Sequence, residues 1–160
     1  MAILKDSGER REFGSGAVRD MSVGKGRMDL LPLDETFQFL RGCGIHDKVI
    51  EHMMAFVDGR AKDMIPAMVA FVKGTGADPY GVLLDISVHF EDGALKYDDD
   101  NWKKGIPVNV YVDSALRHYV KHKMGMDDEP HDRAFMWNVL CGTWTINNMP
   151  ELNPYKESRG

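Results

Sequence analysis

Apolar side chains recur every three or four residues along most of this sequence, and this spacing constrains the fold more than any other feature. Segment 82–97 also alternates between apolar and polar residues as a strand would, but no second convincing strand is present to pair with it. The sequence therefore predicts an all-α bundle. Its helices are expected over residues 34–42, 47–57, 64–73, 82–97, 109–124 and 131–146.

Capping residues and helix breakers set the limits of these segments. Asp34 and Asp63 stand where their side chains can accept hydrogen bonds from the free N–H groups of a helix start. Pro66 falls in a first turn, where proline is tolerated, and Gly42 and Gly74 follow helical segments as stops. We expect one helical domain over residues 33–146 and a loosely held, proline-containing tail over residues 147–160.

The first 32 residues have a different character, because glycine and basic residues dominate them. Glycine at this density disfavours a long helix and lets the backbone approach a ligand closely. Composition alone favours a flexible arm. We therefore expect residues 1–32 to form a glycine-rich basic arm that belongs to the same domain.

Length and charge narrow the classes of function. A chain of 160 residues with 43% hydrophobic residues suits one packed domain, and a net charge of −5 argues against general binding of nucleic acid. The 2 cysteines favour a reduced compartment. No stretch approaches the roughly 18 apolar residues of a membrane span, and the apolar run at the N-terminus is too short for a secretion signal. These features predict a cytoplasmic protein with neither a membrane nor a nucleic-acid partner.

Two groups of acidic residues are candidates for chemistry. Glu91 shares a helical stripe with Leu84, Val88 and Leu95, so its carboxylate lies at the edge of an apolar face. The alternative is a boundary glutamate whose head reaches water. Asp128 and His131 are spaced to share a face of the last helix, where oxygen and nitrogen ligands can bind a cation. Helix capping explains the acidic cluster equally well.

Basic and aromatic residues suggest binding of a phosphate and a base. Arg19, Lys25 and Arg27 lie among glycines, where side-chain cations and backbone amides together suit phosphate oxygens. A tryptophan at position 102 can stack on a base while the amide of Asn101 contacts its edge, although core packing is the commoner role of tryptophan. Neither a phosphate-binding loop of the Walker type nor a nucleophile motif is present.

Five blocks of sequence occur in an order that resembles a phage and bacterial enzyme family. They are SGAVRDMSVGKGRMDLLP (residues 15–32), HFEDGALKYDDDNWKKGIP (89–107), DSALRH (113–118), DEPH (128–131) and WN (137–138), and they cover about half of the chain. The family is that of the dATP/dGTP diphosphohydrolases, which are related to the MazG-like all-α nucleotide pyrophosphohydrolases. The blocks are most similar to its MazZ-like branch in cyanophages, which acts on dGTP.

This resemblance implies a hydrolase that depends on Mg²⁺ or Mn²⁺, with two or three ions in its site. It would cleave a purine deoxynucleoside triphosphate, dGTP or dATP, between the α and β phosphates, and would form a homo-oligomer, either dimer or tetramer. Glu91 and Glu129 would be catalytic, and Glu91, Asp113, Asp128 and Glu129 would bind the metal. The substrate would contact Arg19, Lys25, Arg27, Lys96, Asn101, Trp102, Arg117, His118, His131 and Asn138.

One departure from the family pattern leaves a second hypothesis open. MazG relatives carry paired carboxylates in E-x-x-E and E-x-x-D arrangements, whereas Ala94 follows Glu91 and Ala134 follows His131 at the third position. A helical protein that binds a nucleotide or a partner without catalysis would fit this departure. A nucleic-acid accessory protein is a third hypothesis, which the net acidity disfavours.

Overall fold

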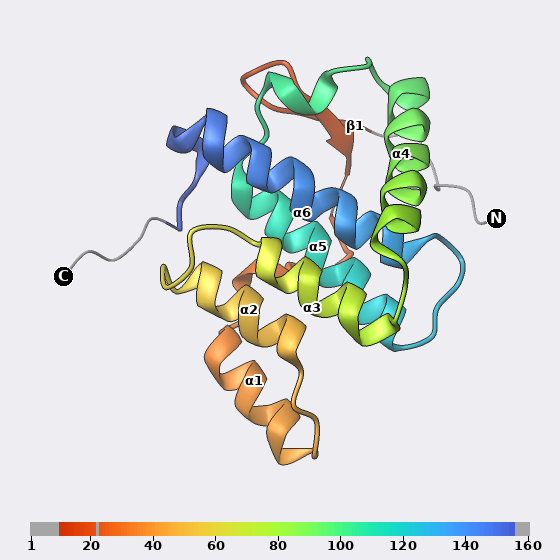
Figure 1. Cartoon of the computed structure of the whole chain (residues 1–160). Coiled ribbons are helices and arrows are strands. Elements are labelled where there is room, and N and C mark those ends of the chain that lie inside the picture. Colours follow the sequence, from red (N-terminus) through yellow and green to blue (C-terminus); the bar gives the residue numbers. More distant parts are fainter. Residues whose placement is uncertain (1–9, 22, 156–160) are drawn as a thin grey trace.

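The computed structural model describes residues 10–21 and 23–155 and confirms the all-α bundle (Figure 1). Helices α5 and α6 run side by side through the middle, and they contact each other more extensively than any other pair of elements. The helices are α1 (Leu33–Gly42), α2 (Lys48–Val57), α3 (Ile65–Thr75), α4 (Pro79–Lys96), α5 (Val108–Lys123) and α6 (His131–Asn148). Three short 3₁₀ turns accompany them, η1 (Met28–Leu30), η2 (Asn101–Lys104) and η3 (Pro150–Leu152).

Aspartate side chains cap some of the helix starts, whereas α5 and α6 begin after Pro107 and Pro130 without a side-chain cap. Asp47 Oδ1 accepts from the Ile50 amide at 3.0 Å, and Asp63 Oδ1 accepts from the Ile65 amide at 2.9 Å. The prediction for Asp34 is wrong: α1 begins at Leu33 after Pro32, and Asp34 lies in the first turn, where the helix dipole favours a carboxylate. Helix α4 begins at Pro79, earlier than predicted, because Asp78 caps it.

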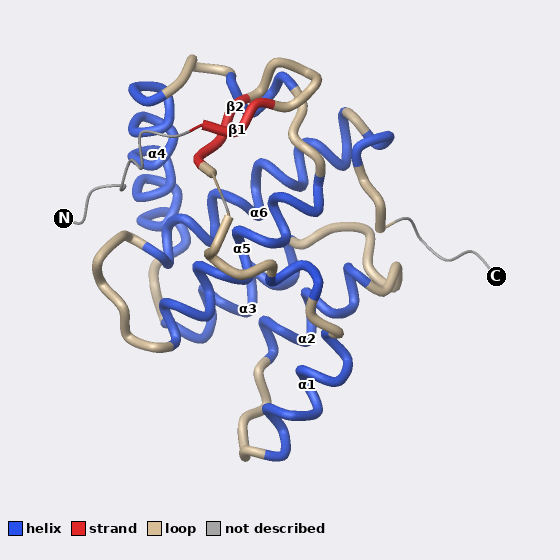
Figure 2. The backbone as a smooth tube through the Cα atoms, turned by 180° about the vertical axis from the view of Figure 1, so that it is seen from behind, coloured by secondary structure: helices blue, strands red, loops and turns tan. Residues whose placement is uncertain are grey.

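The described part of the arm forms a hairpin over residues 10–20 and then a turn that leads into η1, so the interpretation as a flexible arm is wrong there. Strands β1 (Arg10–Glu12) and β2 (Val18–Asp20) pair antiparallel (Figure 2). Asn101 of η2 donates to the Val18 carbonyl at 2.8 Å and accepts from the Val18 amide at 2.9 Å. Ala17 is fully buried, and Ser15 donates to the Gly105 carbonyl. These contacts hold the hairpin on η2.

Residues 149–155, which we expected to be loosely held, contact the bundle. Tyr155 packs edge-on against Phe56, with ring centroids 5.5 Å apart. Gly105 has a φ of 116°, and a Cβ there would lie 2.9 Å from the Met149 side chain and 3.1 Å from that of Leu152. The tail therefore closes over the turn that precedes α5. The first nine residues, residue 22 and residues 156–160 lie outside the described part. None of the described helices is long and apolar enough to span a bilayer.

Close packing at Gly142 joins the central helices. A Cβ on Gly142 of α6 would lie 3.2 Å from the Tyr111 Cβ on α5 and 2.5 Å from the Met64 Cε. Tyr111, Met64 and Phe135 are fully buried around this point. Only glycine lets α5, α6 and the start of α3 approach this closely.

Replacing Gly142 by valine should therefore lower the free energy of unfolding by about 1–3 kcal/mol, because the added methyl groups overpack the core. Gly93→Ala in α4 is the matched control, since nothing lies within 4 Å of its Cβ position. That control should gain about 0.5–1 kcal/mol from helix propensity. Urea denaturation measures both values, and a Gly142→Val protein as stable as the parent would contradict this packing.

Candidate functional site

A cavity of about 550 Å³ lies where the hairpin, α4, η2, α5 and α6 meet. Most of the site residues predicted from the sequence line it, although they come from separate parts of the chain. They are Arg19, Lys25, Lys96, Asn101, Trp102, Arg117, His118, Asp128, Glu129 and Asn138. The fold therefore gathers the basic arm, the η2 loop and the acidic segment before α6 around one space.

Glu91, Arg27, Asp113 and His131 do not line this cavity. Glu91 is exposed on α4, and its stripe partners Leu84 and Leu95 are 71% and 82% exposed. The stripe thus points away from the core, and a single chain does not bring Glu91 to Asp128 and Glu129. Arg27 is exposed and pairs with Asp29 at 2.7 Å.

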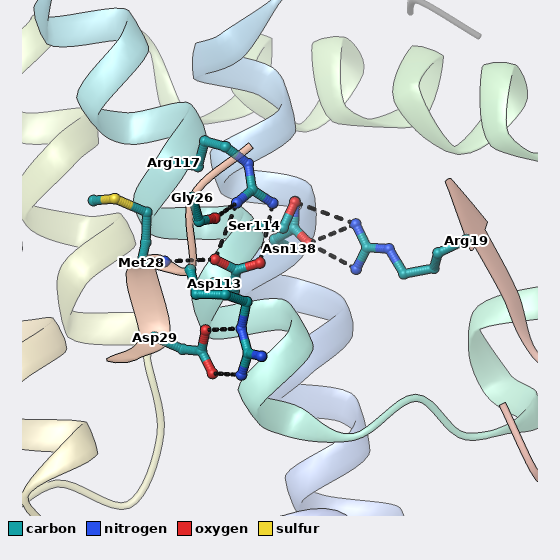
Figure 3. A network of polar contacts seen from close by, with 9 residues as sticks. Arg19, Gly26, Met28, Asp29, Asp113, Ser114, Arg117 and Asn138 are labelled. Atoms are coloured by element: carbon teal, nitrogen blue, oxygen red, sulfur yellow. Dashed lines mark hydrogen bonds and ion pairs between the residues drawn. The ribbon is translucent and has the colours of Figure 1, made fainter. Parts of the chain in front are cut away.

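Asp113, which we expected to bind the metal, lies outside the cavity lining. It is 3% exposed, and its carboxylate accepts two hydrogen bonds from Arg117, at 3.0 and 3.1 Å, and one from the Met28 amide at 2.7 Å (Figure 3). Arg117 also donates to the Gly26 carbonyl at 2.6 Å. Asp113 therefore fastens the arm to α5 and orients Arg117 beside the cavity.

The guanidinium of Arg19 is anchored by neutral oxygens. It donates to Asn138 Oδ1 at 3.2 and 3.3 Å and to Ser114 Oγ at 3.3 Å (Figure 3). It also lies 5.4 and 5.6 Å from the ring centroids of Tyr111 and Trp137. These contacts fix the orientation of the cation without neutralising its charge, which suits binding of an anion.

Other cations lie close enough to affect one another. Arg11 faces Arg19 across the hairpin, and burial, followed by the charge of Arg19, lowers the pKa of Arg11. Partial desolvation and, among its charged neighbours, Arg117 and Lys121 lower the pKa of Lys25. Crowded like charges are unfavourable until an anion joins them. The cavity therefore brings several cations close together, although the carboxylates of Asp20, Asp128 and Glu129 share its lining.

Lys96 is positioned by a second network. Asp20 accepts from Lys96 Nζ at 2.9 Å, from the Tyr97 hydroxyl at 2.7 Å and from Arg10 at 3.1 Å. Asp20 belongs to β2, whereas Lys96 and Tyr97 lie at the end of α4. The carboxylate thus joins the hairpin to α4 and directs the ammonium group at this wall of the cavity.

An acidic and histidine group forms a candidate cation site. The group consists of Asp128, Glu129 and His131, and each residue offers one ligand atom. These three atoms lie within 4.8 Å of one another, a spacing that suits one divalent ion. His131 Nε2 lies 2.8 Å from Asp128 Oδ1, and its Nδ1 lies 2.9 Å from Nδ1 of His118. Because a carboxylate only accepts, neutral rings require His131 Nε2–H to donate to Asp128 and His118 Nδ1–H to donate to His131.

Aromatic side chains make up another wall of the cavity. Phe90, Trp102 and Trp137 line it, with centroid separations of 5.6 Å for Phe90–Trp102 and 5.9 Å for Phe90–Trp137. The amide of Asn101, expected to contact a base, is instead engaged by both polar groups of Val18. Trp102 is partly buried and also packs edge-on against Trp144, with ring centroids 5.1 Å apart.

Several lining residues were not found by sequence reasoning. They are Arg11, Asp20, His89, Lys121 and Trp137. Trp137 and Asp20 stand inside blocks that carry the family resemblance, which was the available signal for them. His89 also begins one of these blocks, whereas Lys121 has no such signal and Arg11 becomes relevant only through the hairpin pairing.

The fold and the cavity define an all-α protein in which cations, acidic side chains and aromatic rings line one cavity. The chain belongs to the dATP/dGTP diphosphohydrolase family, because the model of that family's N-terminal domain matches residues 63–154, more than half of the sequence. That match includes the lining residues from α4 to α6 but not Arg11, Arg19 or Lys25. No curated protein and no solved structure was significantly similar to the chain.

Two buried histidines predict sensitivity to acid. Burial and then Arg133 lower the pKa of His89 to about 3, and burial and then His131 lower that of His118 to about 2. In the unfolded chain a histidine takes up a proton near pH 6.5, so stability is complete above that pH and is lost as the pH falls below it. When the pH falls from 7 to 5, each histidine should lower the free energy of unfolding by about 2 kcal/mol.

The measurement compares urea unfolding of the parent protein and His89→Gln at pH 7 and pH 5. The drop in unfolding free energy between the two pH values should be smaller in His89→Gln by about 2 kcal/mol. Equal drops in both proteins would contradict a neutral, buried His89.

Proposed function

We propose that the protein is a metal-dependent diphosphohydrolase of purine deoxynucleoside triphosphates. Water would attack the α phosphorus of dGTP, or of dATP, the bond from that phosphorus to the bridging oxygen would break, and the products would be the monophosphate and pyrophosphate. The observation that carries the proposal is that one cavity combines several cations, an aromatic wall and the carboxylates of Asp128 and Glu129, with the buried His131 directly behind Asp128. The family match supports the same reaction class.

Each part of the cavity suits one part of the substrate. Arg19 and Lys25 would bind the phosphates, together with Lys96 and Arg117, which the carboxylates of Asp20 and Asp113 already hold in place. Trp102 offers a stacking surface for the purine. A deoxynucleotide substrate would place the enzyme in the cytoplasm.

Asp128, Glu129 and His131 fit a hard divalent cation, because carboxylate oxygens and an imidazole nitrogen are suitable ligands for Mg²⁺ or Mn²⁺. Such ions, two or three in the expected arrangement, neutralise phosphate charge and lower the pKa of water. Glu129, which is partly buried at the cavity, is placed to accept the proton of the attacking water. A ligating His131 Nε2 would leave Nδ1–H to donate to His118, which would fix the ring orientation.

A second candidate function is nucleotide binding without catalysis. The exposed position of Glu91 and the structural use of Asp113 favour it, since both remove expected carboxylates from the cavity. Tight binding of dGTP without turnover, across several divalent metals, would identify the protein as such a binding module.

Product analysis tests the hydrolase directly. Incubation with dGTP and Mg²⁺ should release dGMP and pyrophosphate, and excess EDTA should stop the reaction. Glu129→Gln should lower kcat by about 100-fold or more, because it removes both a ligand and a proton acceptor. Glu151→Gln is the matched control, since Glu151 is exposed in η3, away from the cavity. Full turnover in EDTA, or full activity of Glu129→Gln, would overturn the proposed mechanism.

We further propose that the chain forms a homo-oligomer through the outer face of α4. This face presents Tyr80, Leu83, Leu84 and Leu95, all at least 55% exposed, and a second copy would cover them. Glu91 lies on the same helix and would then lie near an interface.

Sedimentation velocity should show a dimer or tetramer, and Leu84→Asp should shift it toward monomer because a charge enters the apolar contact. Phe39→Asp on α1 is the control, since Phe39 is 68% exposed on a different helix. A monomeric parent protein, or the same response in both variants, would contradict this interface.

A further inference from the structure

The orientation of His89 in the cavity wall is fixed by an arginine. Arg133 Nε donates to His89 Nδ1 at 3.3 Å, while another nitrogen of the same guanidinium donates to Asp92 at 2.9 Å. A guanidinium can only donate, so His89 Nδ1 must be the acceptor. In the neutral ring the hydrogen is therefore on Nε2. His89 is 6% exposed, and burial with the nearby Arg133 charge keeps its pKa low, at about 3.

This donor lies at the aromatic wall. The ring of His89 lies 5.3 Å from that of Trp137, which in turn neighbours Phe90, and all three residues line the cavity. Planar rings at these separations form a surface that suits a planar ligand such as a base.

The hydrogen-bonding groups at this wall are mostly donors. The Arg19 guanidinium lies 5.6 Å from the Trp137 ring centroid, and Trp137 Nε1 is buried without a partner in the described part of the chain. The nearby amide oxygens are engaged, since Asn138 Oδ1 accepts from Arg19 and Asn101 Oδ1 accepts from Val18. A ligand edge with acceptors therefore fits this wall better than one with donors.

We propose that His89 is a specificity-determining residue that donates Nε2–H to the purine base and favours a 6-oxo over a 6-amino purine. Guanine presents O6 and N7 as acceptors on one edge, whereas adenine replaces O6 with an amino donor. Facing His89, the amino group of adenine would leave the buried Nε2–H donor without a partner. The inference rests on the proposed function, and it adds the residue that selects the base.

The experiment measures kcat/KM for dGTP, dITP and dATP with Mg²⁺ in the parent, His89→Leu and His89→Gln. The parent should prefer dGTP and dITP to dATP. His89→Leu should lose about 10- to 100-fold on both 6-oxo substrates, with dATP changing by less than about 3-fold. His89→Gln should retain most of the preference, because a glutamine amide can accept from Arg133 and still donate to the base.

Several outcomes would overturn the inference while leaving the hydrolase intact. Equal losses on all three substrates would mean that His89 contacts the phosphates or the sugar. Equal cleavage of dITP and dATP by the parent protein would also overturn the inference. This result does not depend on whether His89→Leu folds. If no triphosphate is cleaved, the proposed function fails, and calorimetric binding of dGMP and dAMP still tests the base: similar affinities in the parent would reject the role of His89.

Discussion

The ion pair between Asp113 and Arg117 is the contact on which the functional region depends. The carboxylate is almost completely buried in α5, and besides Arg117 it binds the Met28 amide of the arm. Removing one partner of a buried ion pair leaves an uncompensated charge, which typically costs about 3–5 kcal/mol. Because Arg117 also binds the Gly26 carbonyl, this pair holds the segment that carries Lys25. The cavity therefore exists because the arm is fastened across α5.

The cations of the cavity differ in whether a carboxylate or a neutral oxygen holds them. Arg117 and Lys96 pair with the carboxylates of Asp113 and Asp20, respectively. Arg19 is oriented by the amide oxygen of Asn138 and by a hydroxyl, so its charge stays available to an anion. A polyphosphate is the ligand whose charge matches this arrangement, and the low dielectric of a partly enclosed cavity strengthens that attraction.

Helical periodicity predicted the fold well because each helix buries a face through its own sequence. It could not predict which face of α4 meets the bundle. The stripe of Leu84, Glu91 and Leu95 is real, but α6 covers the opposite side, where Val82, Ile86 and His89 are buried. For this reason Glu91 is exposed and does not line the cavity of a single chain, and its role at the site stays a prediction.

The hairpin was missed because its strands have only three residues each, and Asn101, distant in the sequence, fixes one of them. Arg19, Asp128 and Glu129, which were chosen for their chemistry, do line the cavity, and the roles expected of them stay predictions. His89 begins a block that carries the resemblance, but its role depends on Arg133, 44 residues away, and the sequence does not show that the two side chains meet.

Hydrolysis of dGTP in ¹⁸O-labelled water tests the central claim most directly, because the label records which phosphorus is attacked. Attack at the α phosphorus predicts ¹⁸O in dGMP and none in pyrophosphate, as read by mass spectrometry. Label in pyrophosphate or in free phosphate, or the absence of any turnover with Mg²⁺ or Mn²⁺, would contradict the account.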